Sequence, residues 1–252
     1  MDKFIPVNEP LLGEREKELL IECINTGWIS SEGPFVEQFE ESLSKKVNRK
    51  FGISCSSGTA ALDLAIASLE IGPGDEVIMP AFTIISCASA IIKSGAKPVL
   101  VDADPNTWNM NVDEIESVIT SNTVAIMAVH IYGLPVDMDP LIKIANKYKL
   151  AVIEDAAEII GGNYKKKPCG SFGHVSTFSF YPNKQITTGE GGMVVTNDLN
   201  ISNRCKSLRN LCFQKNKRFI HNELGWNYRM TNLQAALGIA QLEKLDSVVK
   251  TK

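Results

Sequence analysis

The chain has 252 residues, of which 44% are hydrophobic and 22% charged, with a net charge of −3. A chain of this length and composition can bury a large core and is typical of a globular α/β protein. Its slightly acidic charge excludes the basic surface that binds nucleic acid or an anionic membrane.

Targeting and redox features point to the cytoplasm. No apolar run is long enough to span a bilayer, and the segment Met1–Pro6 lacks the apolar stretch of a signal peptide. None of the six cysteines forms a CxxC pair or lies at zinc-type spacing from a histidine. We therefore expect free thiols in a reducing compartment, no metal site, and a cytoplasmic protein.

The N-terminal fifth differs from the rest of the chain. Gly33-Pro34 predicts the start of a helix that runs through Phe35–Lys46, because proline suits the first helical turn. The chain before it, which includes Trp28, is predicted to be a loop-like arm.

From residue 51 onward, short β-rich runs alternate with helical patterns. The predicted strands are Phe51–Cys55, Glu76–Met79, Val99–Asp102, Val124–Val129 and Ala151–Ile153. The predicted helices are Thr59–Leu69, Ser86–Lys93, Val112–Ile119 and Leu141–Tyr148. Beyond Gly170, two further strands, Val175–Phe180 and Met193–Thr196, flank a glycine-rich loop without a helix. This alternation predicts an α/β domain with a mostly parallel sheet and helices on both faces.

Lys184 lies in an unusual local sequence. Between Cys169 and Asn197 the only formally charged side chains are those of Lys184 and Glu190, and the lysine is surrounded by aromatics and glycines. Such surroundings hydrate a lysine poorly and favour the neutral, nucleophilic amine. A solvated surface lysine is the ordinary alternative.

Two other segments complement this lysine. Asp155 ends an apolar strand, where open α/β sheets place their ligands, and its carboxylate can hold a ring nitrogen protonated, as pyridoxal phosphate requires. The alternative is an N-cap for a helix that begins at Ala156. Ser56-Ser57-Gly58-Thr59 joins a strand to a helix and forms an anion site suited to a phosphate ester. Together the three segments predict a pyridoxal phosphate site, and the absence of GxGxxG and GxxxxGK[ST] motifs disfavours nicotinamide and P-loop enzymes.

The same residues resemble the DegT/DnrJ/EryC1/StrS sugar aminotransferases, nearly end to end and in the family's order. The motifs that carry the resemblance are Ser56–Leu62, Gly72–Val77, Asp137–Asp139, Glu154–Ala157, Phe178–Lys184, Gly189–Gly192 and Tyr228–Asn232. The resemblance implies the large domain of a fold type I pyridoxal-phosphate-dependent transferase.

The resemblance also implies residue roles. Lys184 is the Schiff-base lysine and moves the proton at the substrate carbon, and Asp155 pairs with the pyridinium nitrogen. Gly58, Thr59 and Ser179 hold the cofactor phosphate, and Asn227 reaches it from the neighbouring subunit. A homodimer with shared active sites, L-glutamate as amino donor and a nucleotide-linked keto sugar as acceptor are therefore expected.

Two positions depart from the family pattern. Glu158 stands where many members have a glutamine that contacts the cofactor's phenolic oxygen, so its carboxyl either takes up a proton or changes the chemistry of the Schiff base. The Glu-Asp-Ala-Ala-Glu form is similar to that of GDP-perosamine synthases, which implies GDP-4-keto-6-deoxymannose as acceptor for O-antigen or other surface polysaccharide. Ile84 stands where many members carry a cofactor-stacking ring; either Ile84 forms an apolar platform or Phe82 swings in.

The domain organisation follows from the same comparison. Residues 1–50 form an arm and helix, residues 51–240 the cofactor-binding domain, and residues 241–252 the start of a connection to the family's smaller C-terminal domain, which is missing from this chain. Two alternatives to an aminotransferase remain open. A truncated regulatory or interaction protein on the same fold is one; a pyridoxal phosphate sugar dehydratase is the other, against which Lys184 speaks because such enzymes carry histidine there.

Overall fold

The computed structural model describes residues 8–214 and 216–251. The segment Met1–Pro6, which is unlike a signal peptide in sequence, lies outside these ranges. Among the described residues, no helix combines the length and the apolar character needed to cross a membrane.

A seven-stranded sheet with strand order β1-β9-β8-β5-β4-β2-β3 forms the centre of the molecule. The pairs from β8 through β3 are parallel, whereas β9 runs antiparallel to both β1 and β8. The mixed, mostly parallel sheet predicted from the sequence is confirmed. Its strands are β1 (Phe51–Cys55), β2 (Glu76–Pro80), β3 (Lys97–Val101), β4 (Thr123–Val129), β5 (Ala151–Asp155), β8 (Val175–Ser179) and β9 (Gly192–Thr196); a separate hairpin pairs β6 (Asn163–Tyr164) with β7 (Lys167–Pro168).

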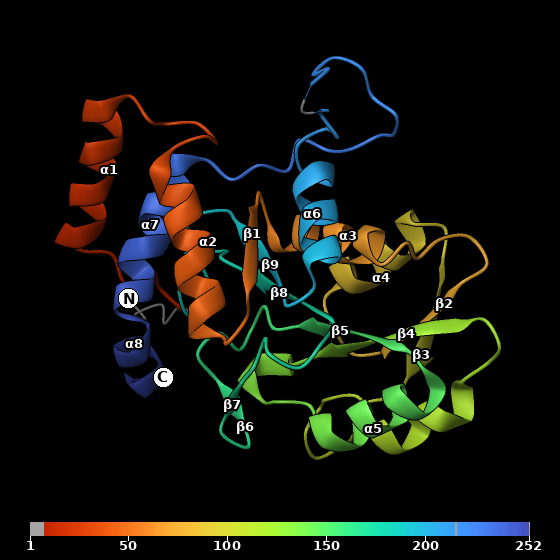
Figure 1. Cartoon of the computed structure of the whole chain (residues 1–252). Coiled ribbons are helices and arrows are strands. Elements are labelled where there is room, and N and C mark those ends of the chain that lie inside the picture. Colours follow the sequence, from red (N-terminus) through yellow and green to blue (C-terminus); the bar gives the residue numbers. More distant parts are fainter. Residues whose placement is uncertain (1–7, 215, 252) are drawn as a thin grey trace, which may run out of the picture.

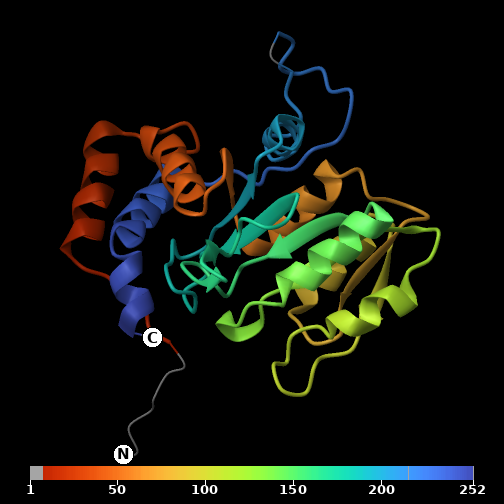
Figure 2. The ribbon, with the colours of Figure 1, turned by 60° about the horizontal axis from the view of Figure 1, so that its bottom comes forward.

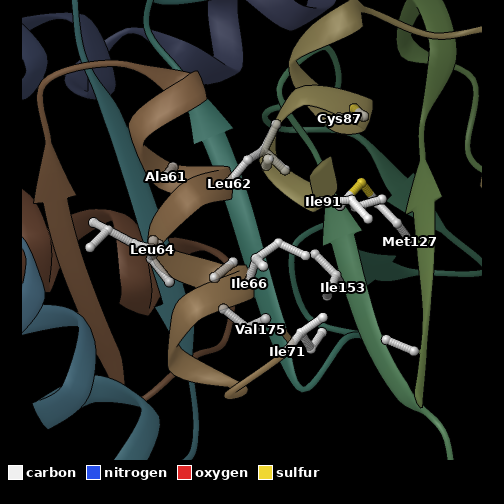
Figure 3. Close-up of a cluster of buried hydrophobic side chains, with 14 of the residues drawn as sticks. Ala61, Leu62, Leu64, Ile66, Ile71, Cys87, Ile91, Met127, Ile153 and Val175 are labelled. Atoms are coloured by element: carbon white, nitrogen blue, oxygen red, sulfur yellow. The ribbon is translucent and has the colours of Figure 1, made fainter. Parts of the chain in front are cut away.

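Helices cover both faces of the sheet (Figure 1). Successive strand residues point to opposite faces, so Val77 of β2 packs into the core under α3, α4 and α6, whereas Ile78 packs into the core on the side of α5. Figure 3 shows Leu62 and Ile66 of α3 packed above Ile153 and Val175 of the sheet. The helices are α3 (Gly58–Ser68), α4 (Ile85–Lys93), α6 (Leu199–Leu208) and α5 (Met138–Tyr148).

The helix predicted over Val112–Ile119 is present as a 3₁₀ helix, η1 (Val112–Val118). The only buried side chains of the segment are Val112 and Ile115, three residues apart. Side chains at i and i+3 align on one face of a 3₁₀ helix. The tighter helix therefore buries both of them with a single turn.

The loop-like arm predicted before Gly33 is wrong over Glu14–Thr26, which forms helix α1, whereas the segment around Trp28 is not helical. Leu19 and Cys23, four residues apart, are buried on one side of the helix. Gly27 ends it with φ 74°, the left-handed conformation that glycine adopts without strain. The sequence carried both signals: the i, i+4 apolar pair and the glycine just beyond the helix.

Helix α1 belongs to a third core, beside the sheet, that joins the two ends of the described chain (Figure 2). It packs with α7 (Asn232–Glu243), which also contacts α2 (Pro34–Lys46) and leads to α8 (Leu245–Thr251). The buried Glu16 of α1 accepts a hydrogen bond from Gln241 at 2.6 Å and pairs with Lys244 at 2.5 Å. The ring of Phe39 lies 5.0 Å from that of Phe180, which ties this core to the loop after β8.

Asn232 is the polar centre of this third core, and its loss should destabilise the fold. Its fully buried side chain accepts a hydrogen bond from the backbone N–H of Phe35 at 2.9 Å and donates to the carbonyl of Trp28 at 2.8 Å. Asn232→Ala leaves both backbone groups buried without these partners, so we expect a loss of about 2–3 kcal/mol in unfolding free energy by urea titration. Asn146→Ala, on the exposed face of α5, is the control and should change stability by roughly 0.5 kcal/mol or less.

Candidate active site

A cavity of about 310 Å³ lies at the carboxyl ends of β4, β5 and β8. In open α/β sheets this is the edge at which ligands bind. Every residue predicted to bind a cofactor lines it, with the single exception of Asn227. The lining residues that the sequence singled out are Gly58, Thr59, Ile84, Asp155, Glu158, Ser179, Lys184 and Glu190.

Lys184 reaches into the cavity from the loop after β8, and its side chain is only 14% exposed. Its amine lies 3.3 Å from Oε1 of Glu158. The other carboxylate oxygen of Glu158 accepts a hydrogen bond from the backbone N–H of Tyr132 at 2.8 Å. The lysine is therefore mostly desolvated and is held by a carboxylate that is itself anchored to the loop after β4.

Asp155 forms the buried floor of the cavity at the end of β5. Its Oδ1 accepts from the backbone N–H of Ala157 at 3.1 Å and from the hydroxyl of Thr177 at 3.4 Å, and its Oδ2 accepts from the thiol of Cys87 at 3.3 Å. Burial raises the pKa of Asp155 above its ordinary value. No helix follows Asp155, since residues 156–162 form turns, so the alternative of a helix N-cap is wrong.

The N-terminus of α3 faces the cavity as an anion site. The hydroxyl of Ser57 caps the helix by accepting from the N–H of Ala60 at 3.1 Å, while no described residue accepts from the N–H groups of Gly58 and Thr59. A Cβ on Gly58 would lie 2.7 Å from Cβ of Ser179, so glycine alone allows these two segments to approach. Two free N–H groups, the helix dipole and the nearby hydroxyls form a cradle for a phosphate.

The structure decides between Ile84 and Phe82. Ile84 lines the cavity and is 59% exposed. Phe82 does not line it; its ring packs instead against Trp108, with centroids 5.4 Å apart, and Tyr132, at 6.1 Å. An aliphatic side chain therefore stands at this place in the cavity wall.

Asn227 does not reach the cavity of its own chain. It is exposed and forms an isolated bridge with Asn210. The sequence resemblance assigns it to a neighbouring subunit's site, a prediction that a single chain does not test.

Two residues that contact site residues were not predicted from the sequence. Cys87 has no motif of its own, yet its thiol is a hydrogen-bond partner of Asp155. Ser86 pairs its hydroxyl with that of Thr59 at 2.9 Å. Their one sequence signal is their place in the first turn of the helix that follows Ile84, on the same edge of the sheet as Asp155.

His130 also lines the cavity and is completely buried. Its Nδ1 accepts from the N–H of Val136 at 3.1 Å, so Nε2 carries the proton and donates to Glu154 at 3.0 Å. Cys169 lies close enough to complete a metal-like group with these two. Hydrogen bonds already occupy the ring nitrogens and the carboxylate, so the group forms a hydrogen-bonded cluster.

The mostly parallel sheet flanked by helices is the fold of an aminotransferase, and comparison with known proteins agrees. Residues 10–252 match the DegT/DnrJ/EryC1/StrS aminotransferase family, so the chain belongs to that family.

Individual proteins of known name are similar to this chain over nearly its whole length. GDP-perosamine synthase from Escherichia coli O157:H7 is 46% identical over 250 residues, which are 99% of this chain and 69% of that protein. GDP-perosamine synthase from Caulobacter vibrioides is 48% identical over 242 residues, 96% of this chain and 65% of that protein. A putative sugar aminotransferase from Streptococcus pneumoniae, solved in its PLP form, superposes with TM-score 0.91 at 30% identity, over 97% of this chain and 68% of that chain. This chain thus spans about two thirds of the length of these relatives.

Proposed function

We propose that the chain transfers an amino group from L-glutamate to a nucleotide-linked 4-keto-6-deoxy sugar, with GDP-4-keto-6-deoxymannose as acceptor and GDP-perosamine as product. The observation that carries the proposal is the meeting of Lys184, Asp155 and the N-terminus of α3 in one cavity. The names of the relatives at 46% and 48% identity support the choice of a GDP-linked sugar.

The charged and polar groups that line the cavity match those of pyridoxal phosphate. Asp155 is a buried carboxylate whose partners in its own chain, an N–H, a hydroxyl and a thiol, are neutral. A protonated ring nitrogen would supply the missing positive charge and oppose the rise in pKa that burial causes. At the other end of the cavity, the unpaired N–H groups of Gly58 and Thr59 would hold the phosphate, with Ser179 beside them. When bound, the cofactor supplies the electron sink that lets a proton leave the carbon bearing the amino group.

Side chains of this chain would then have separate roles in the reaction. Lys184 would attach to the cofactor and afterwards accept and return the proton at the reacting carbon, because its amine is the basic group that reaches into the cavity beside Glu158. Glu158 would orient that amine while held by the N–H of Tyr132. The apolar side chains of Ile84, which is exposed, and of Ile131, which is buried, would limit access of water to the reacting atoms.

The assembly and domain proposals follow from the same family membership. A second copy would complete each site with Asn227, which is exposed and lies outside the cavity of its own chain. Residues 51–240 would form the cofactor-binding domain, with residues 1–50 as its N-terminal arm and helix and residues 241–252 leading toward the family's smaller domain.

Absorbance spectroscopy tests the proposal in two steps. Purified protein loaded with pyridoxal phosphate should show a cofactor band that converts to the pyridoxamine form when L-glutamate is added. Addition of GDP-4-keto-6-deoxymannose should then restore the original band and yield an amino sugar by mass spectrometry. A band that glutamate does not change would contradict the aminotransferase proposal, and restoration by UDP- or dTDP-linked keto sugars alone would replace the proposed acceptor.

A further inference from the structure

Three aromatic side chains form an exposed group beside the cavity, here termed the aromatic lip: Phe82, Trp108 and Tyr132. Their rings contact one another through Phe82, whose centroid lies 5.4 Å from that of Trp108 and 6.1 Å from that of Tyr132. Trp108 is 58% exposed and Tyr132 is 78% exposed. The lip is therefore a group of tilted and edge-on ring contacts whose outer surface meets solvent.

The lip lies on the same edge of the sheet as the cavity. Phe82, Trp108 and Tyr132 follow the carboxyl ends of β2, β3 and β4, which are neighbours in the order β4-β2-β3. The cavity occupies the next part of the same edge, at β8 and β5, and the sequence neighbours Ile84 and Ile131 line it. The lip thus lies beside the cavity on the same edge of the sheet, on the side away from β8.

Hydrogen bonds fix the lip to the cavity wall. The N–H of Tyr132 donates to Glu158, the partner of Lys184, at 2.8 Å. Asn109, next to Trp108, accepts from the N–H of Ile131 at 3.1 Å and so ties the loop after β3 to the loop after β4. The ring positions are therefore set by the same framework that positions the lysine.

Two of the three residues occupy strained backbone conformations. Trp108 has φ 62° and Tyr132 has φ 49°, in the left-handed region that bulky residues rarely adopt. Neither side chain is buried, so hydrophobic burial in this chain does not offset the strain. Strain retained at exposed side chains beside a cavity is typical of ligand-binding positions.

We infer that the aromatic lip is the subsite that stacks the nucleobase of the nucleotide-linked substrate. This inference rests on the proposed function. A sugar that reacts next to Lys184 in a cavity of about 310 Å³ must extend its diphosphate and base beyond the cavity mouth. The lip offers the exposed aromatic rings of Trp108 and Tyr132 there, and every base stacks on an aromatic ring through its π face.

GDP binding to chain 1–252, measured by calorimetry and by tryptophan fluorescence, tests the inference. The chain has three tryptophans, Trp28, Trp108 and Trp226. GDP should quench the fluorescence, Trp108→Phe should remove the quenching but keep the affinity, and Trp108→Ala and Tyr132→Ala should each weaken GDP by roughly tenfold or more. Trp226→Phe, the matched control, should retain the quenching, and pyrophosphate should bind wild type and Trp108→Ala equally.

The outcomes separate this inference from the proposed function. In Trp108→Ala, the response of the cofactor band to glutamate should match that of wild type, because glutamate has no base to stack. Unchanged GDP affinity in both alanine variants would overturn the subsite, as would an absence of GDP binding by wild type. A change of oligomeric state in Trp108→Ala by ultracentrifugation, with GDP affinity kept, would assign the lip to a subunit contact and also overturn it. If wild type binds GDP at the lip but glutamate leaves the cofactor band unchanged, the proposed function fails while the subsite stands.

Discussion

Lys184→Ala is expected to reduce amino transfer by roughly three to four orders of magnitude, because it removes the amine that we propose moves the proton at the reacting carbon. The fold should survive, since the Lys184 side chain has one hydrogen-bond partner, Glu158, and lies at a cavity rather than in a core. Single-turnover conversion of the cofactor band by L-glutamate measures the effect directly. The variant should still bind pyridoxal phosphate through Asp155 and the N-terminus of α3.

Two further variants show whether the loss is chemical. Lys184→Arg keeps a cation beside Glu158, but a guanidinium stays protonated and can neither attach to the cofactor nor accept the proton. It should be as inactive as Lys184→Ala. Lys143→Ala, on the exposed face of α5, should leave the rate unchanged. Glutamate turnover in Lys184→Arg at a rate near that of wild type would remove Lys184 from the proposed chemistry.

That Asp155, Gly58 and Lys184 line one cavity was predictable because each lies at the end of a regular element. Asp155 follows an apolar strand, Gly58 begins a helix directly after another strand, and Lys184 lies in a glycine-flanked loop after a third. The carboxyl ends of parallel strands meet at one edge of a sheet, so residues distant in sequence share a site whenever the alternation of elements is assigned correctly.

The contacts that tune the site were not predictable in the same way. The thiol of Cys87 reaches Asp155 only because α4 begins where β2 ends beside β4, a fact of strand order rather than of local sequence. Likewise, Ile84 lines the cavity while the ring of Phe82 packs against Trp108. The directions of both side chains depend on where helix α4 begins. Local pattern predicts which element forms, but side-chain direction at its ends depends on the neighbours.

The second large effect is expected at Glu154, a buried carboxylate behind the site. Glu154 is completely buried, and its two oxygens accept from His130, from the hydroxyl of Ser176 and from the backbone N–H groups of Gly170, Phe172 and Gly173. Arg49 donates to the carbonyls of Gly170 and Gly173 at 2.7 and 2.6 Å and holds the same loop from the other side. Burial alone would raise the pKa of Glu154, but the His130 ring and the N–H donors lower it to about 2.

Glu154→Gln is therefore expected to reduce the free energy of unfolding at pH 7 by on the order of 3–5 kcal/mol, because an amide offers one acceptor oxygen where a carboxylate offers two. The pH dependence follows from the lowered pKa of the folded state. The stabilisation by Glu154 is complete above its ordinary value of 4.5 and is lost as the pH falls toward 2. Urea unfolding should show a constant difference between wild type and variant from pH 7 to 5, which shrinks below that range. Glu37→Gln, an exposed carboxylate on α2, should show no such difference.

A graded variant keeps this prediction testable if Glu154→Gln does not fold. Ser176→Ala removes one donor to Glu154 at 2.8 Å and one contact of Arg49 at 3.2 Å, and should reduce stability by about 1–2 kcal/mol. Its effect should persist below the ordinary value of 4.5 and fade only as the pH falls toward 2, where the carboxyl of the folded state takes up a proton and the hydroxyl faces a neutral group. Equal destabilisation of Ser176→Ala at pH 7 and near pH 2 would mean that the hydroxyl acts through packing, and that the charge of Glu154 does not hold the loop behind the active site.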